Sequence, residues 1–141
     1  MANVKAAIYA HLKGSSGVTD LVGSSDNMRV YPGRVPDTAG LPYVVVHDIS
    51  GVHEQALSAR AGLVDGRVQL DCWGSTPLEA YNVADAVRLR LDHITYGTSA
   101  GGVTIQGSQV LDTAELSDIE TGLEAADRYG YRVEVNIWYE E

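Results

Sequence analysis

One segment, Gly62 to Ile94, sets the strongest constraint on how this 141-residue chain folds. It begins with an alternation in which Val68, Leu70 and Cys72 are separated by polar residues. This period of two is typical of a strand with one buried face. Gly74 then interrupts the alternation, and a helical pattern follows. The segment predicts a strand, a tight turn and a long helix, so the other elements must extend the same sheet or cover it.

The predicted helix has a clear start and one apolar stripe. Thr76 can cap it with its hydroxyl, Pro77 suits the first helical position, and Glu79 completes a capping box with Thr76. A second set of residues recurs at helical spacing: Ala80, Val83, Ala84, Val87, Leu91 and Ile94. Because these residues form one stripe, we expect that face to pack on the sheet.

The remaining regular elements are shorter or less distinct. Strand patterns cover Leu41 to Ser50, Val103 to Asp112 and Tyr129 to Tyr139, and Arg29 to Tyr31 is a candidate short strand. Apolar residues at helical spacing predict an N-terminal helix over residues 3–13.

Two connecting segments receive minor assignments: Val18 to Val22 is expected to add a short turn of helix, and Thr95 to Gly102 is predicted to be a glycine-rich turn. The sum is a single α+β domain over residues 1–141. Its predicted core is a four-stranded, mainly antiparallel sheet with two helices packed on one face.

Two further segments lack a clear period. Gly51 to Ala61 is polar and flanked by glycines, and we interpret it as a flexible hairpin arm between antiparallel strands. Plain surface disorder is the alternative. Thr113 to Asp127 contains five acids and no base, which predicts a second long, acidic loop.

The charge of the chain excludes some partners. The net charge is −9, and the segment from Asp112 to the end holds nine acids and two bases. This balance disfavours nucleic-acid binding through a basic patch. Solubility is the simplest explanation for the negative charge. The functional explanation is a surface that must repel a polyanion. No apolar run approaches the about 20 residues of a membrane helix, so we expect no membrane partner and assembly in a cytoplasm.

We find no pattern that carries catalysis. No pair among His11, His47, His53 and His93 has the spacing of a zinc-binding helix. Cys72 is the single cysteine and is predicted to be a buried, structural thiol. No glycine-rich phosphate loop or nucleophile elbow is present. We therefore expect a protein that is not an enzyme and that has no metal or cofactor.

The order of the elements and several local patterns resemble the tail terminator, or tail completion, proteins of long-tailed bacteriophages. They also resemble related minor tail and head–tail joining proteins of prophages and gene transfer agents. The resemblance covers nearly the whole chain and involves the following segments: Val30-Tyr-Pro32, Leu41 to Val46, the arm between Gly51 and Gly62, Arg67 to Trp73, the Thr76 to Leu91 helix with Glu79-Ala80, and Tyr131 to Ile137.

This resemblance implies a structural virion subunit that assembles into a ring, expected to be a hexamer. The ring would cap the finished tail tube, stop its polymerisation and join it to the head connector, while DNA passes through the lumen without specific binding. The implied partners are further copies of the chain, the tail tube protein and the head–tail connector protein. The implied location is the head-proximal end of the tail, after assembly in the host bacterial cytoplasm.

Two sets of candidate site residues follow. The predicted subunit or tail-tube interface comprises the arm and two tryptophans: Val52, His53, Glu54, Gln55, Leu57, Arg60, Trp73 and Trp138. Each tryptophan has an alternative role as a cover for neighbouring side chains. The predicted lumen acids are Glu115, Asp118 and Glu120. Two other functions stay open: a head-side connector or stopper ring, and a small-ligand-binding α+β domain with a concave polar pocket.

Overall fold

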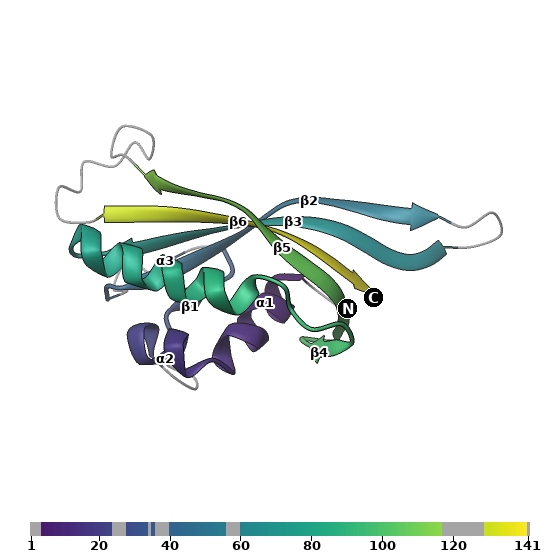
Figure 1. Ribbon diagram of the computed structural model, residues 1–141, viewed down its shortest axis with the longest axis horizontal. Coiled ribbons are helices and arrows are strands. Elements are labelled where there is room, and N and C mark those ends of the chain that lie inside the picture. The colour runs from purple at the N-terminus through teal and green to yellow at the C-terminus, as the bar shows by residue number, and fades with distance from the viewer. Residues whose placement is uncertain are drawn as a thin grey trace.

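The computed structural model describes residues 4–23, 28–33, 35, 40–55, 60–116 and 129–140, and for residues 52–55 and 60–62 it describes the backbone. Within these ranges the chain forms three helices and one six-stranded sheet, so the fold is α+β. Figure 1 shows the helices together on one side of the sheet. In chain order the elements are α1 (Val4–Lys13), α2 (Ser16–Val22), β1 (Val30–Tyr31), β2 (Tyr43–Gln55), β3 (Arg60–Gly74), α3 (Pro77–Leu91), β4 (Thr98–Ala100), β5 (Val103–Leu116) and β6 (Tyr129–Glu140).

The strand order is β1-β2-β3-β6-β5-β4. β1 runs parallel to β2, and every other neighbouring pair among the described strands is antiparallel. The two strands that flank the acidic segment, β5 and β6, therefore pair with each other, and β6 inserts next to β3. The expectation of a mainly antiparallel sheet is confirmed.

The predicted counts of strands and helices are wrong: the described residues hold six strands where four were expected, and three helices where two were expected. The candidate short strand is real and pairs with the start of β2. β4 lies in the segment predicted to be a glycine-rich turn. It pairs with β5 through Gly101 and Gly102, whose φ angles of 56° and 85° suit a two-residue hairpin turn. α2 also forms a full helix where a short turn was expected.

The core lies between the sheet and the helices, as the alternation predicts. Val68, Leu70 and Cys72 of β3 are all 0% exposed. β6 supplies Val133, Val135 and Ile137 to the same cluster. From α3 the buried residues are Ala80, Val83, Ala84, Val87 and Leu91, which is the predicted stripe up to the end of the helix.

The turn from β3 into α3 follows the predicted capping scheme with one difference. The Thr76 hydroxyl accepts the Glu79 backbone N–H at 3.1 Å. The Glu79 carboxylate accepts the backbone N–H of Ser75 at 2.9 Å, one residue earlier than a capping box requires. Gly74 is needed here because an added Cβ would lie 2.6 Å from the Ala80 nitrogen. The chain can fold back from sheet to helix only with a glycine at this position.

Both segments that lack a period are partly strand. β2 and β3 stay paired as far as Gln55 and Arg60, so the hairpin arm is confirmed but its ends are regular. β6 pairs with β3 only from Leu63 onward, so the β2–β3 ribbon projects beyond the body of the subunit (Figure 1). β5 likewise continues to Leu116, into the segment predicted to be an acidic loop.

Candidate assembly surfaces

The projecting ribbon carries most of the predicted interface residues. The structure places the backbone of Val52, His53, Glu54 and Gln55 on β2 and that of Arg60 on β3. Leu57 lies outside the described residues. Register shifts between Asp48 and Ser50 and between His53 and Gln55 interrupt the ribbon. Such bulges bend a strand and increase its twist.

The sheet face opposite the helices, here called the open face, contains a polar network centred on Asp71. The Asp71 side chain is only 12% exposed. It accepts a hydrogen bond from Nε of Arg132 at 3.1 Å and one from the Gln69 amide at 3.3 Å. Nε2 of His47 lies 3.5 Å away. Because a buried carboxylate is costly unless its oxygens are satisfied, these neighbours on β2, β3 and β6 make Asp71 tolerable.

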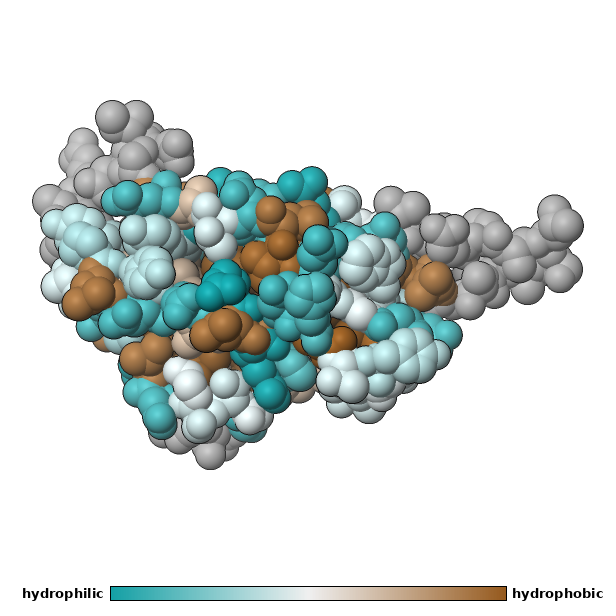
Figure 2. Space-filling view, in the orientation of Figure 1, coloured by the Kyte–Doolittle hydropathy of each residue, from teal (hydrophilic) through white to brown (hydrophobic). Residues whose placement is uncertain are grey.

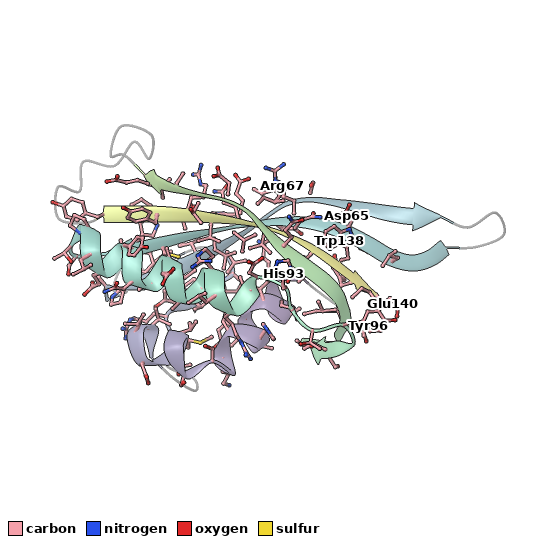
Figure 3. All side chains as sticks on the ribbon, in the orientation of Figure 1. Asp65, Arg67, His93, Tyr96, Trp138 and Glu140 are labelled. Atoms are coloured by element: carbon pink, nitrogen blue, oxygen red, sulfur yellow. The ribbon has the colours of Figure 1, made fainter. Side chains whose placement is uncertain are left out.

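A second cross-strand pair lies further along the open face. A guanidinium nitrogen of Arg67 lies 2.5 Å from a carboxylate oxygen of Glu134. In Figure 3, Arg67 rises from the sheet on the side away from the helices. Each of the arginines that β3 and β6 present on this face among the described residues is therefore paired with a carboxylate. A phosphate backbone passing this face would meet cations that are already neutralised.

Trp73 is largely buried within its own subunit, which favours its alternative role as a cover for neighbouring side chains. It is 7% exposed and packs with Tyr43, Val45 and Leu116 in a small apolar cluster. A Cβ placed on Gly130, its cross-strand partner, would lie 2.8 Å from the Trp73 ring. The ring therefore covers a glycine, which is the alternative role considered for it.

Trp138 has a similar arrangement but is more accessible. It is partly buried and pairs with Gly107 of β5, where a Cβ would lie 3.8 Å from its ring. The register of β5 shifts between Ile105 and Gly107, so the strand is irregular at this position. Figure 3 shows Trp138 near the base of the projecting ribbon, where it stays a candidate contact.

The predicted lumen acids divide between described and undescribed residues. Glu115 belongs to β5, is exposed and pairs with Tyr131 of β6. Asp118 and Glu120 lie outside the described residues. Asp112, also exposed, stands two residues beyond Val110 on β5. The described part of the acidic segment, residues 113–116, is therefore strand, exposed from Thr113 to Glu115 and buried at Leu116.

Sequence reasoning missed a set of hydrogen bonds that joins the end of α3 to β5. The hydroxyl of Ser108, which is 4% exposed, donates to the Leu91 carbonyl at 2.5 Å and accepts the Ile94 N–H at 2.8 Å. Asp92 accepts the Val110 N–H at 3.0 Å. Ser108 stands between Gly107 and Gln109, so no local pattern in the sequence signals this contact. These hydrogen bonds fix the end of α3 against the outer edge of β5.

The described residues include few groups arranged for catalysis or metal binding. They contain no group of three His, Cys, Asp or Glu side chains placed to hold a metal ion. Burial and the nearby Asp71 charge raise the pKa of the Cys72 thiol far above its ordinary value, so the thiol stays protonated. None of the helices in the described ranges is long and apolar enough to cross a membrane.

One open groove of about 580 Å³ lies beside β2. Lys5, Ala6 and Tyr9 of α1 line it, together with Pro32 and Asp48. Its charged groups are one lysine and one aspartate, which is a small set for the convergent polar contacts of a ligand site. Figure 2 shows that hydrophobic residues on the visible face gather in small groups separated by hydrophilic ones.

Comparisons with known proteins identify the family. The chain has the fold of a chain described as "Virion of native gene transfer agent (GTA) particle", with 17% identity, a TM-score of 0.70, and coverage of 98% of this chain and 95% of that one. No curated protein matches the sequence. The family described as "Tail completion protein gp17" matches residues 6–140, which is nearly the whole chain and covers every element described above apart from the first two residues of α1. The chain therefore belongs to the tail completion protein gp17 family, and it is a structural protein of a bacteriophage tail.

Proposed function

We propose that copies of this chain form a ring, expected to be a hexamer, at the head-proximal end of the tail tube. The ring caps the tube, stops its polymerisation and provides the docking surface for the head connector. Family membership over residues 6–140 carries this proposal, because it gives the chain a structural role in the tail. The similarity in fold to a chain described as part of a gene transfer agent virion supports the same setting.

The β2–β3 ribbon is the proposed contact with a neighbouring subunit or with the tube. It projects past the end of β6, so it gains little support from the body of its own subunit. A ring interface joins two different patches on successive copies, and a projecting element on one copy suits such a contact. Shortening the ribbon should therefore impair assembly while leaving the buried core intact.

The open face of the sheet is the proposed wall of the lumen. Arg67 and Arg132 are paired with carboxylates on this face, and Asp112, which is exposed and lies opposite Glu134, adds an acid there. A conduit for DNA must not grip phosphates, because each free cation would add an attractive contact. The net charge of −9 fits this requirement.

Electron microscopy of the protein mixed with tail tubes tests the proposal directly. We expect a ring at one tube end, and tubes that no longer elongate. A chain lacking Val52 to Ala59 should remain folded and soluble but fail to cap, whereas normal capping by this deletion would refute the role of the ribbon. Binding to filled heads with no binding to tubes would favour the head-side connector ring instead.

The lumen assignment has a separate test. Reversal of Glu115, Asp118 and Glu120 to lysine should leave ring formation intact and slow DNA passage, because the new cations would attract phosphates. Ejection kinetics measured at several salt concentrations provide the readout, and the defect should shrink at high salt. Unchanged ejection at low salt would remove these acids from the lumen.

A further inference from the structure

Among the described residues, the outer edge of β2 is largely unpaired. β1 pairs with it only at Val44 and Val45. From Val46 to Gln55 no described strand lies on that side, although β3 pairs with the other side throughout. An edge of this length presents a row of backbone N–H and C=O groups that a further strand can bind.

The opposite margin of the sheet has a second, shorter free edge. β4 pairs with β5 at Val103 to Ile105. The turn after α3 then covers the next part, since the His93 N–H donates to the Ser108 carbonyl at 3.1 Å and Asp92 accepts the Val110 N–H. Beyond Val110 no described strand or turn pairs with the outer side of β5, so its free edge is Leu111 to Leu116.

Both free edges carry a bulge and an exposed apolar side chain. Ile49, at the register shift of β2, is 51% exposed, and Leu111, at the register shift of β5, is 45% exposed. These side chains do not serve the core of their own subunit. Asp112 and Glu115, also on the β5 edge, are charges of the kind that keep a free edge from pairing indiscriminately.

We propose that the outer edge of β5 in one subunit pairs with the outer edge of β2 in the next, so that the sheet continues from copy to copy. This inference rests on the ring proposed above. The strands between the two edges run β2, β3, β6, β5, and each is antiparallel to its neighbour. β5 is therefore antiparallel to β2, and copies related by rotation about an axis along the strands meet in an antiparallel joint.

The blocked parts of each edge determine the offset of this joint. Within one subunit, Leu116 of β5 pairs with Gly130 of β6, Gly130 pairs with Trp73 of β3, and Trp73 pairs with Tyr43 of β2. Leu116 and Tyr43 therefore lie at the same height across the sheet. Since β1 occupies β2 up to Val45, Leu116 can pair with the next copy only three or more residues further along β2. In a closed barrel the strands tilt by about 40° to the axis and lie about 4.8 Å apart. Across the four strands β2, β3, β6 and β5 of one subunit, this tilt displaces the pairing register by roughly 16 Å along the strands, or about five residues. The geometry of a closed barrel therefore matches the free segments.

Amide hydrogen exchange tests the proposal on the full chain, free and assembled on tail tubes. We expect alternate amides in Val46 to Gly51 and in Leu111 to Leu116 to exchange on the order of 100-fold more slowly in the ring. Amides between β3 and β6 are paired already and serve as the internal control. A ring visible by microscopy with unprotected edges would overturn the edge joint and leave the ring function standing. Absence of any ring on tubes would overturn both.

Cysteine cross-linking fixes the register. Thr113→Cys on β5 is combined in turn with Ile49→Cys, Ser50→Cys or Gly51→Cys on β2, which lie opposite it at offsets of three, four and five residues. Directly opposed residues in an antiparallel pair lie within disulfide range, so oxidation of assembled rings should give covalent multimers for one combination. Single variants should give none, because Cys72 is buried. Intact rings without cross-links for any combination would contradict the joint.

A matched pair of variants separates the edge from general surface effects. Leu111→Asp should lower ring assembly by about tenfold or more, because a charge would be buried at the joint. Leu89→Asp, on the outer surface of α3 and 63% exposed, should assemble normally. Thermal unfolding of both subunits checks that folding is unaffected. Equal assembly by the two variants would count against the joint.

Discussion

The two faces of the sheet follow the same alternation and yet differ in kind. On the face under the helices, β3 and β6 bury Val68, Leu70, Val133 and Val135 completely. On the open face, the residues between them form ion pairs and a satisfied buried carboxylate. The comparison teaches that most of the stability of this subunit resides on the helix-covered face, because apolar burial is the dominant favourable term in folding and the open face buries only the small cluster around Trp73. The other face is left available to present a defined charge.

The largest expected effect comes from the covered face. Leu70→Ala should lower the free energy of unfolding by about 2–5 kcal/mol, since it removes a 0% exposed side chain and leaves a cavity. Gln69→Ala, the adjacent residue on the open face, should cost only about 0.5–1 kcal/mol for its hydrogen bond to Asp71. Urea unfolding measures both. Similar losses would mean that the two faces contribute equally.

The next effect concerns the buried carboxylate of the open face. Asp71→Ala should cost about 1–3 kcal/mol, because Arg132 and Gln69 lose their acceptor in a largely buried site. Asp71→Asn keeps an acceptor oxygen and should cost less. Denaturant unfolding of both variants gives the comparison, and the prediction is wrong if alanine and asparagine behave alike.

Sequence patterns predicted the covered face well and the open face poorly, for a physical reason. Burial of Val68, Leu70 and Cys72 follows from period two within one strand, which is a local signal. The partners of Asp71 come from β2, β3 and β6, so they depend on strand order and register, which no local pattern contains. The same dependence hid the burial of Trp73, whose ring covers a glycine of β6.

Two further misses have local causes. The glycines of residues 95–102 predict irregular chain and so conceal β4, although Gly101-Gly102 is itself a hairpin signal. The last residues of β5 are polar and acidic, so the strand pattern ends before the strand does. An edge strand with a polar exposed surface lacks the alternation by which strands are recognised.

A smaller effect is expected from the exposed pair on the open face. A double-mutant cycle on Arg67→Ala and Glu134→Ala should give a coupling free energy of about 0.2–1 kcal/mol, as for other accessible ion pairs. The coupling should fall in 1 M salt. Because the pair is proposed to mask a cation in the lumen, Glu134→Ala should slow DNA ejection more than Arg67→Ala does. Equal ejection rates would indicate that the pair does not face DNA.

The smallest expected effect is a pH dependence of the unfolding free energy that arises from His11 in the helix layer. Burial, then the positive charge of Arg90, lowers the pKa of His11 below its ordinary value of 6.5, while a backbone hydrogen bond with Arg90 opposes this. The folded state therefore disfavours the protonated imidazole, and below pH 6.5 the unfolded chain binds the proton first. The contribution of His11 to stability is complete above pH 6.5 and is lost as the pH falls through the lower folded value.

His11→Gln should remove this part of the pH dependence, measured as the difference in unfolding free energy between pH 8 and pH 5. On the open face, His47 lies beside the Asp71 carboxylate instead of a guanidinium, so the two histidines have neighbours of opposite charge. An unchanged slope in His11→Gln would show that other groups of the helix layer cause the acid sensitivity.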